Sequence, residues 1–416
     1  MPTLFFIFGI TGDLARTKLL PALAHLYEEG LLPDTFSIVG FGRREWDDTR
    51  LREYVKEVLK DNASFKNHQD FIEHFTYQEG QFDLLASYER LALKIAPQAN
   101  KLFYLAVPPS NYADIFKNLS VSKLSVPNEN GWARILVEKP FGNNLKEAQS
   151  LNTLAKELFR KGQLFRIDHY LAKQTVQNII AFRRNNSAYE KKWNNEYITE
   201  IVASLFEERS VGTRGAFYDV VGALKDVGQN HVLEMLALTL MNLPESVEAD
   251  IQHLRTDVLH KLEVDSEFKA QYEGYTNEPG VQKDSKTETF FKVSARLENE
   301  RWKGVKLIMQ SGKNISPSEV RVDVAFKDGE VVTFFIQPKT SIVSNLDQKI
   351  LDVNEKIGRD AYEKLFLDAL QGEKSSFASG EEVEAAWKFT EGVIEKWKDM
   401  PLHTYAQKSK HGILES

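Results

Sequence analysis

Eight consecutive residues, RIDHYLAK at positions 166–173, bring two cations, a carboxylate, a histidine and a phenol next to one another. At the end of a strand or in a tight loop, some of these groups would face a shared cleft. A ligand that is both anionic and rich in hydroxyl groups needs this combination, because fixed positive charge binds a phosphate and the other groups hydrogen-bond to hydroxyls. On its own, the stretch is equally well explained as a solvated polar loop.

The N-terminal residues predict an element that binds a nucleotide. Residues 4–8 (LFFIF) form a continuous apolar run, typical of a central parallel strand, and the turn GITGDL at 9–14 leads into a helical pattern. Strand, glycine turn and helix open a dinucleotide-binding βαβ unit, in which backbone N–H groups at the helix start bind the pyrophosphate. The spacing is G-x-x-G instead of G-x-G-x-x-G, so the turn alone fits an ordinary strand–helix connection equally well.

The second predicted strand indicates which dinucleotide would bind. Residues 36–39 are followed by GFGRR at 40–44. In a dinucleotide-binding fold the end of this strand lies beside the adenine ribose, where an acid suits the 2′-hydroxyl of NAD and an arginine suits the 2′-phosphate of NADP. Arg43 and Arg44 therefore favour NADP, although two arginines in a loop can also be simply solvated.

Two further strands and a helix would place chemically capable residues at the same edge of this sheet. Residues 102–107 and 134–137 are apolar strands, and EKPFG at 138–142 follows the second; a helix at 145–161 leads to a last strand at 164–167. Because Lys139 follows the C-terminal end of a parallel strand, we expect it where cofactor and substrate meet. The same reasoning places RIDHYLAK at the end of the last strand.

The pattern changes beyond about residue 174. A helix expected over 218–240 carries Asp226 and His231, and alternating strands at 198–206, 289–297, 305–310, 319–326 and 331–336 predict an antiparallel sheet. Helices at about 359–371 and 381–398 close the chain.

Composition narrows the class of protein. The chain has 416 residues, enough for two domains, a net charge of −7 and no cysteine. The charge argues against a nucleic-acid or acidic-membrane surface, and the lack of cysteine excludes disulfides and thiolate-ligated metals within this chain. His68 and His74 are six residues apart and do not share a helical face, so no metal site is predicted. Neither a signal peptide nor a membrane span is expected.

Seven segments together resemble a known family. They are FGITGDLARTKLLPAL, VGFGRRE, VEKPFG, RIDHYLAKQTVQN, ALKDVGQNH, NERWKGVKLIMQSGK and RDAYEKLFLDAL, and in this order they resemble glucose-6-phosphate dehydrogenase from about residue 4 to 398. The resemblance implies an α/β plus α+β fold: a Rossmann-like NADP-binding domain over 1–172, and a domain with a large, mainly antiparallel sheet over 173–416. It also implies a cytoplasmic homodimer or homotetramer that oxidises glucose 6-phosphate to 6-phosphogluconolactone with NADP, the first step of the oxidative pentose phosphate pathway.

The resemblance also implies roles for individual residues. His231 matches the general base, whose ordinary pKa of about 6.5 suits proton transfer near neutral pH, and Asp168 matches the acid that orients it. The implied substrate-binding residues are Lys139, His169, Tyr170, Lys173, Glu207, Asp226 and Lys313. The implied cofactor-binding residues are Gly9, Ile10, Thr11, Gly12, Asp13, Leu14, Arg43 and Lys139.

The sequence departs from the family pattern at a few positions. Ala172 replaces the usual glycine and Gln174 the usual glutamate. Gln310 stands where an arginine is often seen, and the segment after Lys313 is short and lacks a basic residue. We therefore expect one side of the substrate pocket to be less positive than usual.

Two other functions are compatible with parts of the sequence. One is a related two-domain dehydrogenase with an EKP motif that acts on an unphosphorylated sugar or cyclitol, although His169 and Lys173 would then have no phosphate to bind. The other is a catalytically silent homologue that binds NADP as a sensor, although His231 and Asp168 would then have no role.

Overall fold

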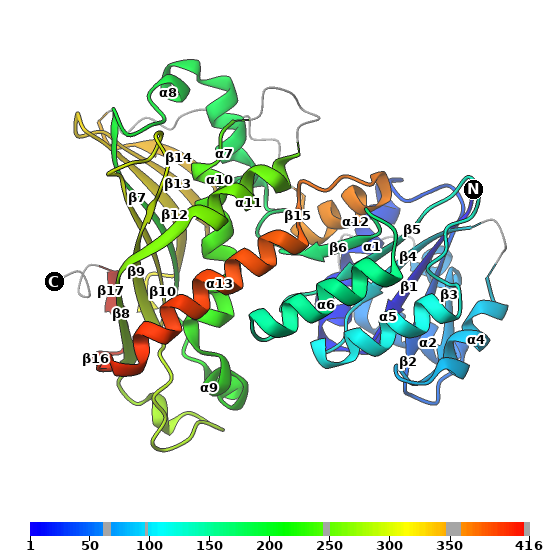
Figure 1. The fold of residues 1–416 in the computed structure, drawn as a ribbon. Helices are drawn as coiled ribbons and strands as arrows, with labels where there is room; N and C mark the ends of the chain where they lie inside the picture. The colour runs from blue at the N-terminus through cyan, green and yellow to red at the C-terminus, as the bar shows by residue number, and fades with distance from the viewer. Residues whose placement is uncertain (61–67, 96–98, 244–249, 347–358, 412–416) are drawn as a thin grey trace. The chain divides into compact units, whose positions relative to one another are not determined.

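The computed structural model describes residues 1–60, 68–95, 99–243, 250–346 and 359–411. The chain divides into two compact units (Figure 1). The first contains Met1–Ala172 and Arg359–Gly380, and the second contains Lys173–Gly358 and Glu381–Ser416. None of the helices in the described part of the chain is long and apolar enough to pass through a lipid bilayer.

The first unit is built on a parallel sheet. Among the described residues this sheet has seven strands in the order β15-β6-β5-β4-β1-β2-β3, and only the edge strand β15 runs antiparallel to its neighbour. The strands are β1 (Thr3–Phe8), β2 (Phe36–Gly42), β3 (Phe75–Glu79), β4 (Asn100–Leu105), β5 (Ala133–Val137), β6 (Leu164–Ile167) and β15 (Phe377–Ala378). The continuous apolar run at the N-terminus is central, because β1 pairs with β2 on one side and β4 on the other.

Helices cover both faces of this sheet (Figure 1). They are the π-helix η1 (Ala15–Leu19), α1 (Leu20–Glu28), α2 (Asp48–Leu59), α3 (His68–Glu73), α4 (Leu85–Leu93), η2 (Pro109–Asn111), α5 (Tyr112–Val121), α6 (Leu145–Leu158) and α12 (Ala361–Gln371). Residues 359–380, which the division at residue 172 assigned to the C-terminal domain, belong to this unit. Phe366 of α12 packs against Phe5 and Tyr104 with ring centroids 6.3 and 5.5 Å apart, and Arg134 donates to the carbonyl oxygen of Ala369 at 2.6 Å.

The second unit is built on a mixed, mostly antiparallel sheet. In the described part of the chain this sheet has eight strands, in the order β14-β13-β12-β7-β10-β9-β8-β16. Only the pairs β7–β10 and β8–β16 are parallel. The strands are β7 (Ile198–Glu207), β8 (Leu262–Tyr272), β9 (Phe290–Leu297), β10 (Lys306–Lys313), β12 (Glu319–Phe326), β13 (Val331–Gln337), β14 (Ser341–Ser344) and β16 (His403–Tyr405). Buried and less buried residues alternate strictly along β12, as expected for a strand with one core face. A small separate sheet pairs β11 (Ile315–Ser316) with β17 (Ser409–Lys410).

The helices of the second unit include one that differs from its prediction. They are α7 (Gln174–Asn185), α8 (Ser187–Lys191), η3 (Gly212–Arg214), α9 (Gly215–Ala223), the π-helix η4 (Leu224–Val232), α10 (Leu233–Leu240), α11 (Ile251–Lys261), η5 (Tyr275–Asn277), α13 (Gly380–Lys396) and η6 (Trp397–Asp399). The sequence pattern predicted a continuous helix over 218–240. That prediction is wrong at Gly222, where φ is 71° and ψ is 173°; helical geometry resumes at Ala223, and the π-helix η4 begins at Leu224.

Candidate active site

The glycine turn after β1 presents backbone, as a dinucleotide site requires. Gly9 has φ of 78°, and a Cβ atom there would lie 2.5 Å from the carbonyl oxygen of Ala106. The Gly12 N–H donates to the Gly9 oxygen at 2.8 Å, and the Arg16 N–H donates to the Gly12 oxygen at 3.0 Å. Only glycine combines this backbone conformation with so close a neighbour, so the turn keeps the start of the following helix open to a phosphate.

Two cations stand at the end of β2. Arg43 and Arg44 are both exposed, and their guanidinium groups lie over the rings of Phe82 (5.8 Å) and Trp46 (5.2 Å). The aromatic rings hold the side chains without neutralising them, so positive charge is available where the adenine ribose of a dinucleotide would lie.

Lys139 follows β5 beside the half-buried Glu138. The Tyr104 hydroxyl donates a short hydrogen bond to the Glu138 carboxylate, and the Tyr112 hydroxyl donates to the Glu138 carbonyl oxygen at 2.9 Å. Burial raises the pKa of Glu138 to about 7, against the opposing effects of the Tyr104 hydrogen bond and the Lys139 charge. The peptide bond between Lys139 and Pro140 is cis.

The RIDHYLAK segment makes a turn directly after β6. Asp168 is 4% exposed, and its carboxylate accepts from the Tyr170 N–H at 2.9 Å. The His169 ring lies 5.0 Å from the Tyr170 ring. Since β1, β5 and β6 are parallel, Gly9, Lys139 and Asp168 all follow the same edge of the sheet.

The two cations of that segment have different positions. Arg166 lies over the ring of Phe141 at 4.5 Å and donates to the Asn152 side chain on α6 at 2.5 Å. Lys173 is the N-cap residue of α7 and belongs to the second unit. Arg166 therefore acts as a packing residue of the first unit, and the segment divides between the units.

Three predicted substrate residues meet in the second unit. Glu207 and Lys313 are register partners at the ends of the parallel strands β7 and β10, and their side chains form a close ion pair. Lys313 is 7% exposed, and its Nζ lies 4.0 Å from an Asp226 carboxylate oxygen. Arg214 approaches Asp226 to 3.5 Å. The result is a buried lysine between two carboxylates, all three of which can hydrogen-bond to sugar hydroxyls.

His231 and Asp226 share the π-helix η4. His231 is 2% exposed. The i→i+5 hydrogen bonds of a π-helix stack residues five apart one turn above the other, so Asp226 and His231 point to the same side. The Asn230 side chain supports this segment: it accepts from the His231 N–H at 2.8 Å and donates to the Asp226 carbonyl oxygen at 3.2 Å. π-Helical turns of this kind are frequent at functional sites.

Comparisons with known proteins identify the family that this chain resembles. The family model described as "Glucose-6-phosphate dehydrogenase, NAD binding domain" matches residues 6–178, and "Glucose-6-phosphate dehydrogenase, C-terminal domain" matches 180–353 and 339–413. Glucose-6-phosphate 1-dehydrogenase of Bacillus subtilis (strain 168) is 34% identical over 446 residues, covering 94% of this chain and 91% of that protein. The enzyme of the same name from Chlamydia pneumoniae is 32% identical over 458 residues, covering 95% and 90%. A solved glucose-6-phosphate dehydrogenase in complex with its substrate glucose-6-phosphate has a TM-score of 0.90 at 30% identity, covering 99% and 96%.

The chain belongs to the glucose-6-phosphate dehydrogenase family. The predicted fold class is confirmed: an N-terminal nucleotide-binding domain, and a C-terminal domain with a large, mostly antiparallel sheet. The chain is therefore an enzyme of this family, and the alternatives of a silent sensor or a dehydrogenase of neutral sugars lose their main support.

The structure shows where two of the departures from the glucose-6-phosphate dehydrogenase pattern lie. Ala172 is fully buried in the core of the first unit. Gln310 is 5% exposed and donates to the Ser204 hydroxyl at 3.1 Å. Because successive strand residues alternate between faces, Gln310 points away from Lys313, three residues further along β10. The expectation of a less positive substrate pocket stays a prediction.

Sequence reasoning missed Tyr218 in the same region. This tyrosine is 1% exposed, its ring centroid lies 5.5 Å from the Lys313 Nζ, and its hydroxyl has no hydrogen-bond partner among the described residues. Burial and the nearby Asp226 charge raise its pKa well above the usual range. No local signal distinguishes Tyr218 from any other apolar-face residue of a helix, because its partners come from distant strands.

Proposed function

We propose that this chain oxidises glucose 6-phosphate at C1 to 6-phosphogluconolactone with His231 as the general base. The single observation that supports this best is the cluster of Glu207, Asp226 and Lys313 around the helix that also carries His231. A sugar held by these groups would have its hydroxyls fixed relative to one imidazole. The solved relative with a TM-score of 0.90 is described as bound to glucose 6-phosphate.

NADP fits the first unit. Because Gly9 has no Cβ, the turn at 9–14 can pack closely against Ala106 and keep its backbone N–H groups accessible. Arg43 provides exposed positive charge for a 2′-phosphate. Gly9, Ile10, Thr11, Gly12, Asp13 and Leu14 would hold the pyrophosphate, and Lys139 the nicotinamide end. When bound, NADP supplies the acceptor for the hydride that leaves C1.

The chain's own residues bind the substrate and remove the proton. His169, Tyr170 and Lys173 would hold the phosphate, since a phosphate needs cations and hydrogen-bond donors together. Lys139, Glu207, Asp226 and Lys313 would bind the sugar. His231 takes the C1 hydroxyl proton, and Asp168 would orient the imidazole and stabilise its protonated form, as a carboxylate does for a catalytic histidine.

His231→Asn tests the base. We expect kcat to fall by roughly two to four orders of magnitude, the usual contribution of a positioned acid or base, with little change in glucose 6-phosphate affinity. NADPH absorbance with glucose 6-phosphate, glucose and no sugar is the measurement. His260→Asn, at an exposed position on α11, is the matched control. Near-native turnover of His231→Asn would remove His231 from this role, and equal turnover of free glucose would remove the phosphate from recognition.

The assembly and the compartment are also proposals. We expect a homodimer or homotetramer that acts in the cytoplasm on a small molecule, without nucleic acid or membrane. The net charge of −7 is consistent with this expectation. Light scattering of the purified chain measures the assembly, and a monomer active at all concentrations would reject it.

A further inference from the structure

The helix that carries Asp226 and His231 begins at a break in the chain. Gly222 has φ of 71°, and helical geometry resumes at Ala223, with φ of −64° and ψ of −40°. The first N–H groups of a helix have no acceptor within the helix and need one from elsewhere. At this break the acceptor is not supplied by a neighbouring residue in the sequence.

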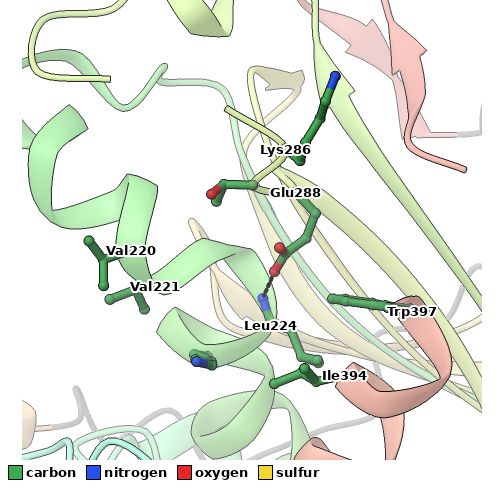
Figure 2. A pocket seen from close by; sticks show the side chains of 9 residues that line it. Val220, Val221, Leu224, Lys286, Glu288, Ile394 and Trp397 are labelled. Carbon is green, nitrogen blue, oxygen red and sulfur yellow. Dashed lines mark hydrogen bonds between the residues drawn. The ribbon is translucent and has the colours of Figure 1, made fainter. Parts of the chain in front are cut away.

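Glu288 supplies it from a distant segment. Its carboxylate oxygen Oε1 accepts from the Leu224 N–H at 2.9 Å, and its carbonyl oxygen accepts from the Ala223 N–H at 3.2 Å. Figure 2 shows the Glu288 side chain pointing at the Leu224 nitrogen. A Cβ atom at Gly222 would lie 2.4 Å from Oε1, so the glycine leaves the space that the carboxylate occupies.

The same segment holds a second part of the candidate site. Thr289 follows Glu288, and its carbonyl oxygen accepts from the Lys313 N–H at 2.9 Å. Two consecutive residues therefore connect the start of η4 with the end of β10. Asp226 lies two residues after Leu224, and its carboxylate lies 4.0 Å from the Lys313 Nζ. A shift at the start of η4 would move Asp226 and His231 relative to Lys313.

We propose that Glu288 is a positioning residue for the dehydrogenase reaction, acting through the Leu224 backbone to place Asp226 and His231. The inference rests on the proposed roles of those two residues. Misplacement of a catalytic group by about 1 Å can cost on the order of 100-fold in rate. Loss of the Glu288 carboxylate should therefore lower kcat and leave the affinity of the first unit for NADP unchanged.

The cavity beside the Glu288 carboxylate allows its role to be tested by chemical rescue. A cavity of about 280 Å³ borders it, lined by Val220, Val221, Leu224, Lys225, Lys286, Thr287, Glu288, Ile394 and Trp397 (Figure 2). Burial raises the pKa of Glu288 to about 7, while the Leu224 N–H, Lys225 and Lys269 lower it. A cavity with two lysines in its lining admits a small carboxylate. Formate can therefore replace the missing side chain of a truncated variant at the Leu224 N–H.

Glu288→Ala is the test variant, measured as the full chain. We expect kcat to fall roughly 10- to 100-fold while the KM for NADP changes less than about twofold. The deuterium isotope effect on kcat with glucose 6-phosphate labelled at C1 should rise, because proton and hydride removal become slower. Sodium formate should restore turnover in a concentration-dependent way, and sodium chloride at equal ionic strength should not.

Two further variants cover a failure of Glu288→Ala to fold. Glu288→Gln keeps an acceptor oxygen at the same reach and should lose much less turnover than Glu288→Asp, whose carboxylate is one methylene too short. Asp250→Ala is the matched control, because Asp250 caps α11 by accepting from the His253 N–H at 3.2 Å, and α11 carries no proposed site residue. It should lower stability and leave kcat alone.

Each outcome decides one point. Unchanged kcat in Glu288→Ala, equal losses in Glu288→Gln and Glu288→Asp, or no formate rescue would overturn the inference. His231→Asn is measured alongside. If it retains turnover, the assignment of the base fails, whereas a loss in His231→Asn with wild-type kcat in Glu288→Ala overturns the role of Glu288 alone.

Discussion

The two units of this molecule position their functional groups by different means. In the first, the groups follow the ends of parallel strands: the turn at Gly9 after β1, Lys139 after β5 and Asp168 after β6. In the second, side chains on two paired strands meet a helix that begins at a break, and a residue 64 positions away in the chain caps that helix. The first arrangement depends on backbone conformation, and the second on side-chain contacts between distant segments.

With the site residues proposed above, this difference would separate nucleotide binding from sugar binding. A pyrophosphate has the same shape in every dinucleotide and can be bound by N–H groups of a turn. A sugar phosphate has hydroxyls in a specific arrangement and needs side chains of both charges, as in the Glu207, Asp226 and Lys313 cluster. Substitutions should therefore affect one binding event without the other.

Among the variants that compare binding in the two units, the largest expected effect is that of Gly9→Ala in the first unit. A side chain there requires φ of 78° and places Cβ 2.5 Å from the Ala106 oxygen. We expect NADP affinity to fall on the order of 100-fold, about 2.7 kcal/mol, as measured by calorimetry. Gly30→Ala is the control, since Gly30 has φ of 67° but no atom within 4 Å of its would-be Cβ. Equal losses in both variants would show that backbone strain, and not the close approach, is the cause.

Lys313→Met should have the next largest effect, in the second unit. Hydrogen bonds to charged groups contribute about 1.5–3 kcal/mol, so the KM for glucose 6-phosphate should rise roughly 10- to 100-fold. Calorimetry should find NADP affinity unchanged. The control is Lys306→Met, because Lys306 pairs with Glu200 at 3.3 Å across the opposite end of the same two strands and is half-exposed. A matching loss of NADP affinity in Lys313→Met would break the separation between the units.

The same difference explains what the sequence predicts and what it does not. Gly9, Lys139 and Asp168 each follow an apolar run, so their place at a strand end follows from local residues. The break at Gly222 is not predictable in this way, because a glycine within a helical pattern is usually tolerated and its partner Glu288 lies in another segment. The pattern therefore predicted one helix over 218–240, where the structure has three helical segments within the described chain.

Two other features were not predicted. The strand β8 (LEVDSEFKAQY) alternates apolar and polar residues except at Ser266, so the local signal of a strand was present and was missed. The helix at about 359–371 was predicted, but local sequence does not say which core it joins. That information is in contacts such as Phe366 with Tyr104.

The two units nevertheless share one feature, a half-buried glutamate beside the site, and this gives the smallest expected effect. Burial raises the pKa of Glu138 in the first unit to about 7, from an ordinary value near 4.5. Between pH 4.5 and about pH 7, Glu138 keeps its proton in the folded protein but has lost it in the unfolded chain. The free energy of unfolding therefore falls as the pH rises through this range. Above about pH 7 the group is ionised in both states, and the stability does not fall further. Glu138→Gln cannot ionise but keeps an acceptor for the Tyr104 hydroxyl.

The melting temperature of Glu138→Gln relative to wild type should therefore increase from pH 5 to pH 8, by roughly 2–6 °C. Differential scanning calorimetry at several pH values measures this, with Glu157→Gln at an exposed position on α6 as the control. A melting-temperature difference that shrinks with rising pH would mean that Glu138 is stabilised as an anion, through Lys139 and Tyr104. In that case a charged side chain would position Lys139 in the first unit as well. The two units would then differ less in how they position their functional groups.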